Sequence, residues 1–289
     1  MRTAPTVAIS GDWHLGEHDK KAIECFFAYC ARYQPGTIVL NGDITDNVEL
    51  HKSQRGLRVP VVRGRGSLFT GEEVVLTHIL LKCLRGLCPD SRIVYIEGNH
   101  EGRLPRLIAS SLPEIYSSIP QLPELLGLKS LGIEWVPYSE ELVIGDFHIF
   151  HGRKCNIHAA MTEGKDVGGS MVQGHTHRLK QYTSTTSSGQ VYYWVEGGHL
   201  RLISASYTAR KYPSWAQGWT VLTTSAHGLL PSLVPMVNGK GVAVVRPGEI
   251  ISYEDINMAK VWAHVERALV TGKTKEVRRV LEGRLWDAA

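Results

Sequence analysis

The sequence lacks long hydrophobic runs, and its first residues contain no apolar core of the kind that a signal peptide needs. A helix that crosses a membrane requires roughly 20 consecutive, mostly apolar residues. Without such a run, a membrane-spanning helix and a membrane partner are not expected. The sequence therefore predicts a cytoplasmic protein.

Cysteine is scarce and forms no paired motif. The five cysteines include no Cys-x-x-Cys pair, and an odd, sparse set in a chain of 289 residues is not typical of a disulfide framework. This usage indicates reduced thiols, as expected for the cytoplasm.

Charge is only weakly unbalanced, at a formal net value of +4, so the composition is compatible with an anionic substrate without requiring one. No internal repeat or low-complexity tract divides the chain. The length suits one sizeable core with a modest appendage. We predict a main domain at 1–250 and a C-terminal helical extension at 251–289.

Three short apolar runs, at 6–10, 37–40 and 92–97, are typical of buried strands. Helical patterns at 19–32 and 71–87 separate them. Strand–helix–strand units place the carboxyl ends of parallel strands along one edge of a sheet. The polar residues that follow these ends should therefore lie close together. They are Asp12, His14, Asp43, Asn99 and His100.

The motif Gly174-His175-Thr176-His177 follows the apolar pair Met171-Val172. Alternate side chains of an extended segment face the same side, so His175 and His177 can reach one point in space. Taken singly, each motif has an ordinary alternative, such as surface histidines here or a helix cap at Asp12. Their joint occurrence at strand ends favours a metal site.

Three other histidines lie in or after predicted strands. His148 and His151 should face opposite sides of a strand at 147–150, and we place His151 in the site because it follows the strand end beside a glycine. His199 lies in another strand-end loop. We expect His199 at most to contact the ligand residues without binding a metal itself. The alternative is an ordinary loop histidine with its hydrogen bonds satisfied.

Two segments differ in character from the rest. The predicted loop insertion at 51–70 is basic and carries no acid between 51 and 66, so it could hold a phosphate backbone or be a solvated insertion. Its candidate substrate-binding residues are Arg55, Arg58, Arg63 and Arg65. The leucine-rich segment 103–131 reads as short helices broken by prolines, and its Arg103 could contact a phosphate oxygen or form a structural salt bridge.

The candidate ligands combine two carboxylates, one amide and several imidazoles. This set suits divalent transition metals and is too rich in nitrogen for calcium or magnesium alone. Manganese is favoured, with iron, zinc, cobalt or nickel as alternatives. The number of ligands exceeds the needs of one ion, and two ions bridged by a shared aspartate would use them all.

In their order along the chain, the motifs resemble those of the calcineurin-like metallophosphoesterase superfamily. Five blocks carry the resemblance: Gly11-Asp12-Trp13-His14, Asn41-Gly42-Asp43, Gly98-Asn99-His100-Glu101, His151-Gly152 and Gly174-His175-Thr176-His177. The resemblance implies an α/β fold of four layers, an α-β-β-α sandwich of two mixed sheets flanked by helices. It also implies that the main domain, 1–250, is catalytic.

The resemblance also assigns roles to individual residues. One metal would take Asp12, His14, Asp43 and His177, and the other Asp43, Asn99, His151 and His175. A hydroxide bridging the two ions would be the nucleophile, and His100 would act as general acid or stabilise the transition state.

The match to the Ser/Thr protein phosphatases within this superfamily is incomplete. Those enzymes carry Asp-Arg-Gly where this chain has Asp46-Asn47-Val48, and an arginine before Gly-Asn-His where it has Ile96-Glu97. Two phosphate-clamping arginines are therefore missing. The sequence looks more like phage and bacterial phosphoesterases, which would place a phage-encoded protein in the host cytoplasm.

Three functions remain open from the sequence. The first is a two-metal phosphodiesterase or nuclease-type enzyme acting on nucleotide or nucleic-acid esters, which the basic loop favours. The second is a phosphomonoesterase acting on a small phosphorylated substrate. The third is a metal-binding subunit without catalysis, which the intact set of ligands disfavours.

Overall fold

The computed structural model describes residues 7–50, 70–203, 214–237 and 240–271. The candidate substrate-binding residues Arg55, Arg58, Arg63 and Arg65 lie outside these ranges. In the described part, no helix combines the length and the apolar character required to cross a bilayer.

The larger sheet has eight strands in the order β13-β12-β11-β10-β1-β2-β3-β4. Strands β1 to β4 run parallel, and β10 joins the other side of β1 in an antiparallel sense. The strand bounds are β1 Val7–Ser10, β2 Thr37–Asn41, β3 Arg92–Ile96, β4 Ile133–Val136, β10 Gly218–Ser225, β11 Gly228–Val237, β12 Val242–Arg246 and β13 Glu249–Ser252.

The smaller sheet has five strands in the order β5-β6-β7-β9-β8. Its inner strands β6, β7 and β9 are parallel, and both edges are antiparallel, so this sheet is mixed like the first. The bounds are β5 Leu142–Ile144, β6 Phe147–Phe150, β7 Ser170–Gln173, β8 Leu179–Thr185 and β9 Val191–Gly197.

Alternation of side chains along the strands produces the layers. In β1, Val7 and Ile9 join an apolar cluster with Ile149 and Val172 of the smaller sheet, so this cluster lies between the sheets. Ala8 faces the opposite way, into the largest core cluster. That cluster packs the outer face of the larger sheet against α1 Lys20–Tyr33, α2 Thr70–Leu87 and α6 Ala259–Thr271.

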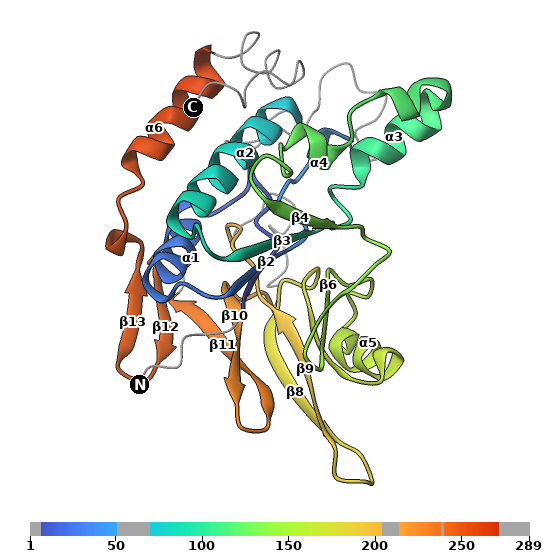
Figure 1. Ribbon diagram of the computed structural model, residues 1–289, viewed down its shortest axis with the longest axis vertical. Coiled ribbons are helices and arrows are strands. Elements are labelled where there is room, and N and C mark those ends of the chain that lie inside the picture. Colours follow the sequence, from blue (N-terminus) through green and yellow to red (C-terminus); the bar gives the residue numbers. More distant parts are fainter. Residues whose placement is uncertain (1–6, 51–69, 204–213, 238–239, 272–289) are drawn as a thin grey trace.

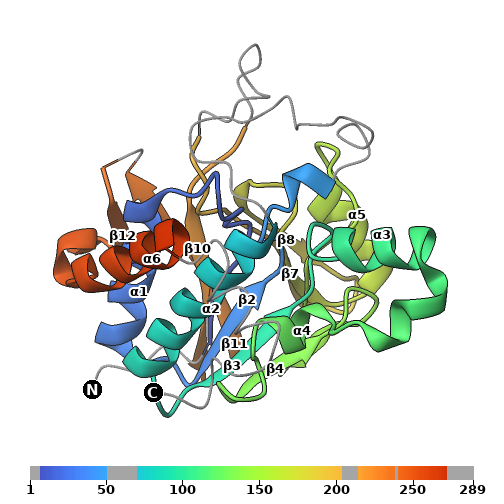
Figure 2. The ribbon, with the colours of Figure 1, turned by 90° about the horizontal axis from the view of Figure 1, so that it is seen from above.

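The smaller sheet is covered on its outer face by α5 Ala159–Val167, whose Ala160 packs with Met171 and Trp194. Figures 1 and 2 show α1 and α6 on one side of the molecule and α5 on the other, with both sheets between them. The predicted four-layer sandwich of two mixed sheets flanked by helices is confirmed.

The expected helix at 19–32 forms because its ends are well capped. The Asp19 carboxylate accepts hydrogen bonds from the backbone N–H groups of Lys21 and Ala22, which are otherwise unsatisfied in the first turn. Gln34 ends the helix in the left-handed conformation. The segment 103–131 contains short helices, as predicted: α3 Arg103–Ser111, a 3-10 helix at Pro113–Ser118 and α4 Leu122–Leu125.

The bounds of α5 follow from a turn before the helix and a closely packed glycine within it. The Asn156 side chain accepts a hydrogen bond from the His158 backbone N–H and makes a turn before the helix begins at Ala159. The helix continues through Gly164 to Val167. A glycine is needed at position 164 because a Cβ there would lie only 2.3 Å from the Trp194 side chain.

The division after residue 250 stays a prediction. Strand β13 runs across this point, from Glu249 to Ser252. Trp262, Val265 and Ala268 of α6 belong to the largest core cluster. The described part of the extension therefore packs against the main domain rather than projecting from it.

Candidate metal centre

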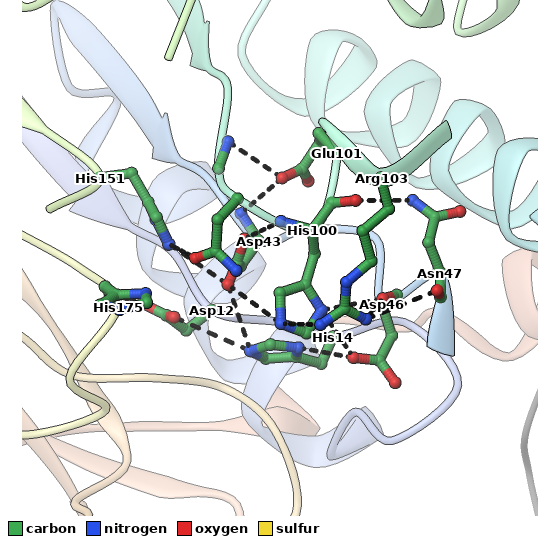
Figure 3. Close-up of polar contacts among 12 residues, drawn as sticks. Asp12, His14, Asp43, Asp46, Asn47, His100, Glu101, Arg103, His151 and His175 are labelled. Atoms are coloured by element: carbon green, nitrogen blue, oxygen red, sulfur yellow. Dashed lines mark hydrogen bonds and ion pairs between the residues drawn. The ribbon is translucent and has the colours of Figure 1, made fainter. Parts of the chain in front are cut away.

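The predicted ligands all follow the carboxyl ends of strands. Asp12 and His14 follow β1, Asp43 follows β2, and Asn99 and His100 follow β3. In the smaller sheet, His151 follows β6, and His175 and His177 follow β7. Figure 3 shows side chains from both sheets converging, because the two sheets end at the same side of the sandwich.

A first group of buried side chains consists of Asp12, His14 and His177. His177 Nε2 lies 3.1 Å from Asp12 Oδ1 and 3.0 Å from His14 Nε2. His14 Nε2 lies 3.8 Å from the same Asp12 oxygen. Three potential ligand atoms thus surround one point.

A second group consists of Asp43, His151 and His175. His151 Nε2 lies 3.2 Å from Asp43 Oδ2 and 3.2 Å from the Asn99 side-chain oxygen, which brings the predicted amide ligand to the same place. Asp43 Oδ2 is also 3.9 Å from His14 Nε2 of the first group. The Asp43 carboxylate therefore lies between the two groups, where a bridging ligand would have to be.

His100 lies beside both groups and is held by Asp46. His100 Nδ1 is 2.8 Å from the Asp46 carbonyl oxygen and 3.0 Å from its carboxylate, while Nε2 is 3.6 Å from Asp43 Oδ2. The Asp46 carboxylate also contacts His14 Nδ1 at 2.9 Å. Arg103 donates to the Asp46 carbonyl at 2.8 Å, and its Nη2 lies 2.9 Å from His100 Nε2. These contacts place Arg103 within the site.

The loop that carries Asp43 is anchored by Glu101. Its buried carboxylate accepts hydrogen bonds of 2.8–3.0 Å from the backbone N–H groups of Asp43, Ile44, Thr45 and Gly98, and from the Tyr95 hydroxyl at 2.9 Å. The loops that carry Asp43 and Gly98 lie so close together that a Cβ on Gly98 would be 2.2 Å from the Asp43 nitrogen. Glu101 is therefore a structural anchor for the loop carrying the bridging candidate.

Many of these residues have left-handed backbone conformations, which cost non-glycine residues about 1–2 kcal/mol each. Such strain persists only where surrounding contacts impose it, and it gathers at functional sites. The residues concerned are Asp12 (φ 52°), His14 (47°), Asp43 (51°), Asn47 (46°), His175 (66°) and His177 (56°).

Neighbouring carboxylates favour the protonated forms of two of the imidazoles, His14 and His151. Burial by itself would lower the pKa of His14, but the neighbouring Asp12 and Asp46 carboxylates raise it to about 9. Burial also disfavours the charged form of His151, yet the neighbouring Asp43 raises its pKa to about 10. Because metal ligands must lose these protons, a bound divalent cation would replace them, and its affinity would increase with pH.

The donors fit divalent transition metals. Asp12 Oδ1 is fully buried and accepts no hydrogen bond of good geometry among the described residues. His14 Nε2 and His177 Nε2 face each other at 3.0 Å, an arrangement that needs a proton or a cation between the two nitrogens. Together with the amide oxygen of Asn99, these mixed oxygen and nitrogen donors match manganese, iron, zinc, cobalt or nickel.

The sequence did not indicate four residues that shape the site. Asp46 lies three residues after Asp43, and Glu101 ends the Gly98–Glu101 motif, but nothing in the sequence shows that they turn back toward His14 and Asp43. Trp215 packs edge-on against His177, with ring centroids 4.5 Å apart, and the Arg201 guanidinium lies 5.3 Å from the Trp215 ring. No motif signals these last two.

No protein-family model matches the chain. The protein is similar to the Gene 54 protein of Mycobacterium phage L5, with 23% identity over 247 residues, or 81% of this chain and 94% of the phage protein. The Gene 54 protein of Mycobacterium phage D29 matches with the same identity and coverage. Among solved structures, Chaetomium thermophilum Vps29 matches with a TM-score of 0.44 and 10% identity, over 80% of this chain and 90% of Vps29. None of these names states an activity, so function is argued from the site.

Proposed function

We propose that the protein is a two-metal phosphoester hydrolase of the calcineurin-like metallophosphoesterase superfamily, acting as a phosphodiesterase on nucleotide or nucleic-acid esters. One observation carries the proposal: the Asp43 carboxylate lies between two buried ligand groups, with His100 Nε2 at 3.6 Å. A shared aspartate between two ions is the arrangement used for in-line displacement at phosphorus.

When bound, two cations would lower the pKa of a water molecule and neutralise phosphate oxygens. Asp12, His14, Asp43 and His177 would hold one ion, and Asp43, Asn99, His151 and His175 the other. Manganese is our first choice, since these donors suit it and its close neighbours in the transition series.

His100 is the proposed general acid. Asp46 fixes its Nδ1, so Nε2 points toward the ligand groups and can protonate a leaving oxygen. Arg103 Nη2 lies 2.9 Å from this nitrogen. A phosphate oxygen would attract the guanidinium away from Nε2, and Arg103 would then bind the substrate. His100 Nε2 would take up a proton from water and donate it to the leaving oxygen.

Two positions favour a diester over a monoester substrate. Asn47 and Glu97 stand where related protein phosphatases carry arginines, and neither supplies positive charge. The Asn47 amide donates to Thr45 Oγ1 and to the His100 carbonyl, and Glu97 accepts from the Tyr138 N–H, so both are engaged in local structure. A dianionic monoester needs more positive charge around its terminal oxygens than a monoanionic diester does.

The test compares a bis-ester and a mono-ester of one chromogenic phenol, with metal-free protein to which manganese is added. We expect turnover to depend on the metal and to be faster with the bis-ester. Faster cleavage of the mono-ester would favour the phosphomonoesterase alternative. Bound metal without turnover of either ester would favour a non-catalytic metal-binding subunit.

Replacing His100 by alanine should lower turnover by about 100- to 10,000-fold, the usual contribution of a positioned general acid, while both metals stay bound. Turnover and metal content measured on the same sample check this. His148→Ala is the control, because His148 pairs with Glu141 away from the site. Loss of metal from the His100 variant would instead make this residue a ligand.

A further inference from the structure

One imidazole in the metal centre lacks a hydrogen-bond partner on the side that faces away from the ligands. His14 Nδ1 contacts the Asp46 carboxylate at 2.9 Å, and His151 Nδ1 donates to the Asn41 carbonyl at 2.8 Å. His177 also directs Nε2 toward the ligand group, but its buried Nδ1 has no partner among the described residues. Histidines that bind metals nearly always donate their second ring nitrogen to an acceptor, which fixes the tautomer and the ring orientation.

His199 packs against the His177 ring. It is fully buried, its ring centroid is 5.3 Å from that of His177, and both its ring nitrogens lack partners among the described residues. Within the described part of the chain, three rings pack around His177: His14, His199 and Trp215. His14 is on the Nε2 side, and an indole can only donate. Among these rings, His199 is therefore the one that offers an acceptor to Nδ1.

The backbone around His199 is tied to the ligand loops on both sides. The Gly198 N–H donates to the Arg178 carbonyl at 2.8 Å, one residue after His177. The Leu200 N–H donates to the Asp12 carbonyl at 3.2 Å, and the His199 carbonyl accepts from the Gly218 N–H at 3.1 Å. His199 is thus held in place by the same segments that carry the first ligand group.

We propose that His199 is a positioning residue: it accepts a hydrogen bond from His177 Nδ1, directly or through one water molecule, and thereby aims His177 Nε2 at the cation held with Asp12 and His14. This inference rests on the proposed two-metal function. A neutral imidazole has one acceptor nitrogen and one N–H, so His199 can accept the hydrogen bond that His177 Nδ1–H donates. A water between the rings would find polar partners on both of them.

The proposal makes a selective prediction, because His199 stands behind one ligand group only. His199→Phe keeps the ring and its packing but removes the acceptor. It should weaken binding of one of the two manganese ions by about 10- to 100-fold and leave the other unchanged. His199→Gln keeps an acceptor oxygen and should recover most of the affinity. Titration calorimetry and metal analysis measure both ions, and the spectrum of a manganese pair in electron paramagnetic resonance should change to that of a single ion.

Two controls separate this role from general packing. His78→Phe replaces another buried histidine, whose Nδ1 bonds to the Leu126 carbonyl far from the ligands, and should bind manganese normally. The metal-free melting temperature of His199→Phe should stay near that of the unmodified protein, while the increase caused by manganese becomes smaller.

Wild-type affinity for both ions in His199→Phe would overturn the inference, as would equal weakening of both ions without recovery in His199→Gln. Unmodified protein that binds no manganese would overturn the proposed function, and this inference with it. Two bound ions in the unmodified protein and an unchanged His199→Phe variant would defeat the inference alone.

Discussion

Replacement of Asp43 by asparagine is expected to lower turnover by at least about 1000-fold, which corresponds to about 4 kcal/mol of transition-state stabilisation, and to reduce the content of both metals. Asparagine preserves the shape of the side chain but removes its charge and one acceptor oxygen. Asp43 Oδ2 is 3.2 Å from His151 Nε2 and 3.9 Å from His14 Nε2, so each ligand group loses an anionic neighbour. Removing one shared ligand should therefore affect two ions at once.

Metal content by mass spectrometry and turnover of the better ester measure this effect. The matched control is Asp146→Asn, in the exposed turn between β5 and β6, which should keep both metals and full activity. The backbone N–H of His100 donates to Asp43 Oδ1 at 2.9 Å, and the asparagine variant can retain this bond if its amide oxygen takes that position. Two ions and full turnover in Asp43→Asn would contradict the bridging role.

Replacement of Glu101 by alanine is expected to destabilise the protein by about 4 kcal/mol and to abolish tight metal binding. The substitution leaves four backbone N–H groups and the Tyr95 hydroxyl without their acceptor in a buried loop. Each unsatisfied buried donor costs about 1–3 kcal/mol, and relaxation of the loop relieves part of the total. The relaxation moves Asp43, which couples the loss of stability to the loss of metal.

Urea unfolding of the metal-free protein isolates the effect of the anchor on stability, and a manganese titration follows its effect on the site. Glu97→Ala is the control. The half-buried Glu97 directly follows β3, four residues before Glu101, but its carboxylate accepts one backbone hydrogen bond, from Tyr138 at 3.1 Å. Glu97→Ala should cost about 1 kcal/mol. If Glu101→Ala unfolds at the same urea concentration as Glu97→Ala, the carboxylate is not the anchor described.

The proximity of the candidate ligand residues could be predicted from the sequence because their positions follow from a local rule. A buried apolar run predicts a strand, and parallel strands bring their carboxyl ends together, so Asp12, Asp43 and Asn99 had to be neighbours. Asp46 and Glu101 could not be assigned in this way. Their roles depend on how two loops fold back on each other, and the distance between those loops is not encoded in any short pattern.

Strand β11 is a second feature that short sequence patterns could not predict, in this case in the fold. Its segment contains Pro231 and Pro235, which argue against a central strand because proline cannot donate to the ladder. The structure resolves the conflict: β12 pairs with Met236 and Val237 alone, so among the described strands most of β11 has a single neighbour, β10. The prolines therefore lie along a free edge that the sequence alone could not locate.

The position of β1 in the larger sheet has a consequence for the time course of folding. Ala8 pairs with Ile38 on one side but with Val221 on the other, so the strand that leads to Asp12 is completed by a segment near the opposite end of the chain. Pairings between residues so far apart in sequence close slowly, on a scale of about milliseconds to seconds. During synthesis, one edge of β1 remains unpaired until β10 has been synthesised. Metal binding by the group containing Asp12 would then be a late event, coupled to closure of the sheet rather than to formation of the first strands.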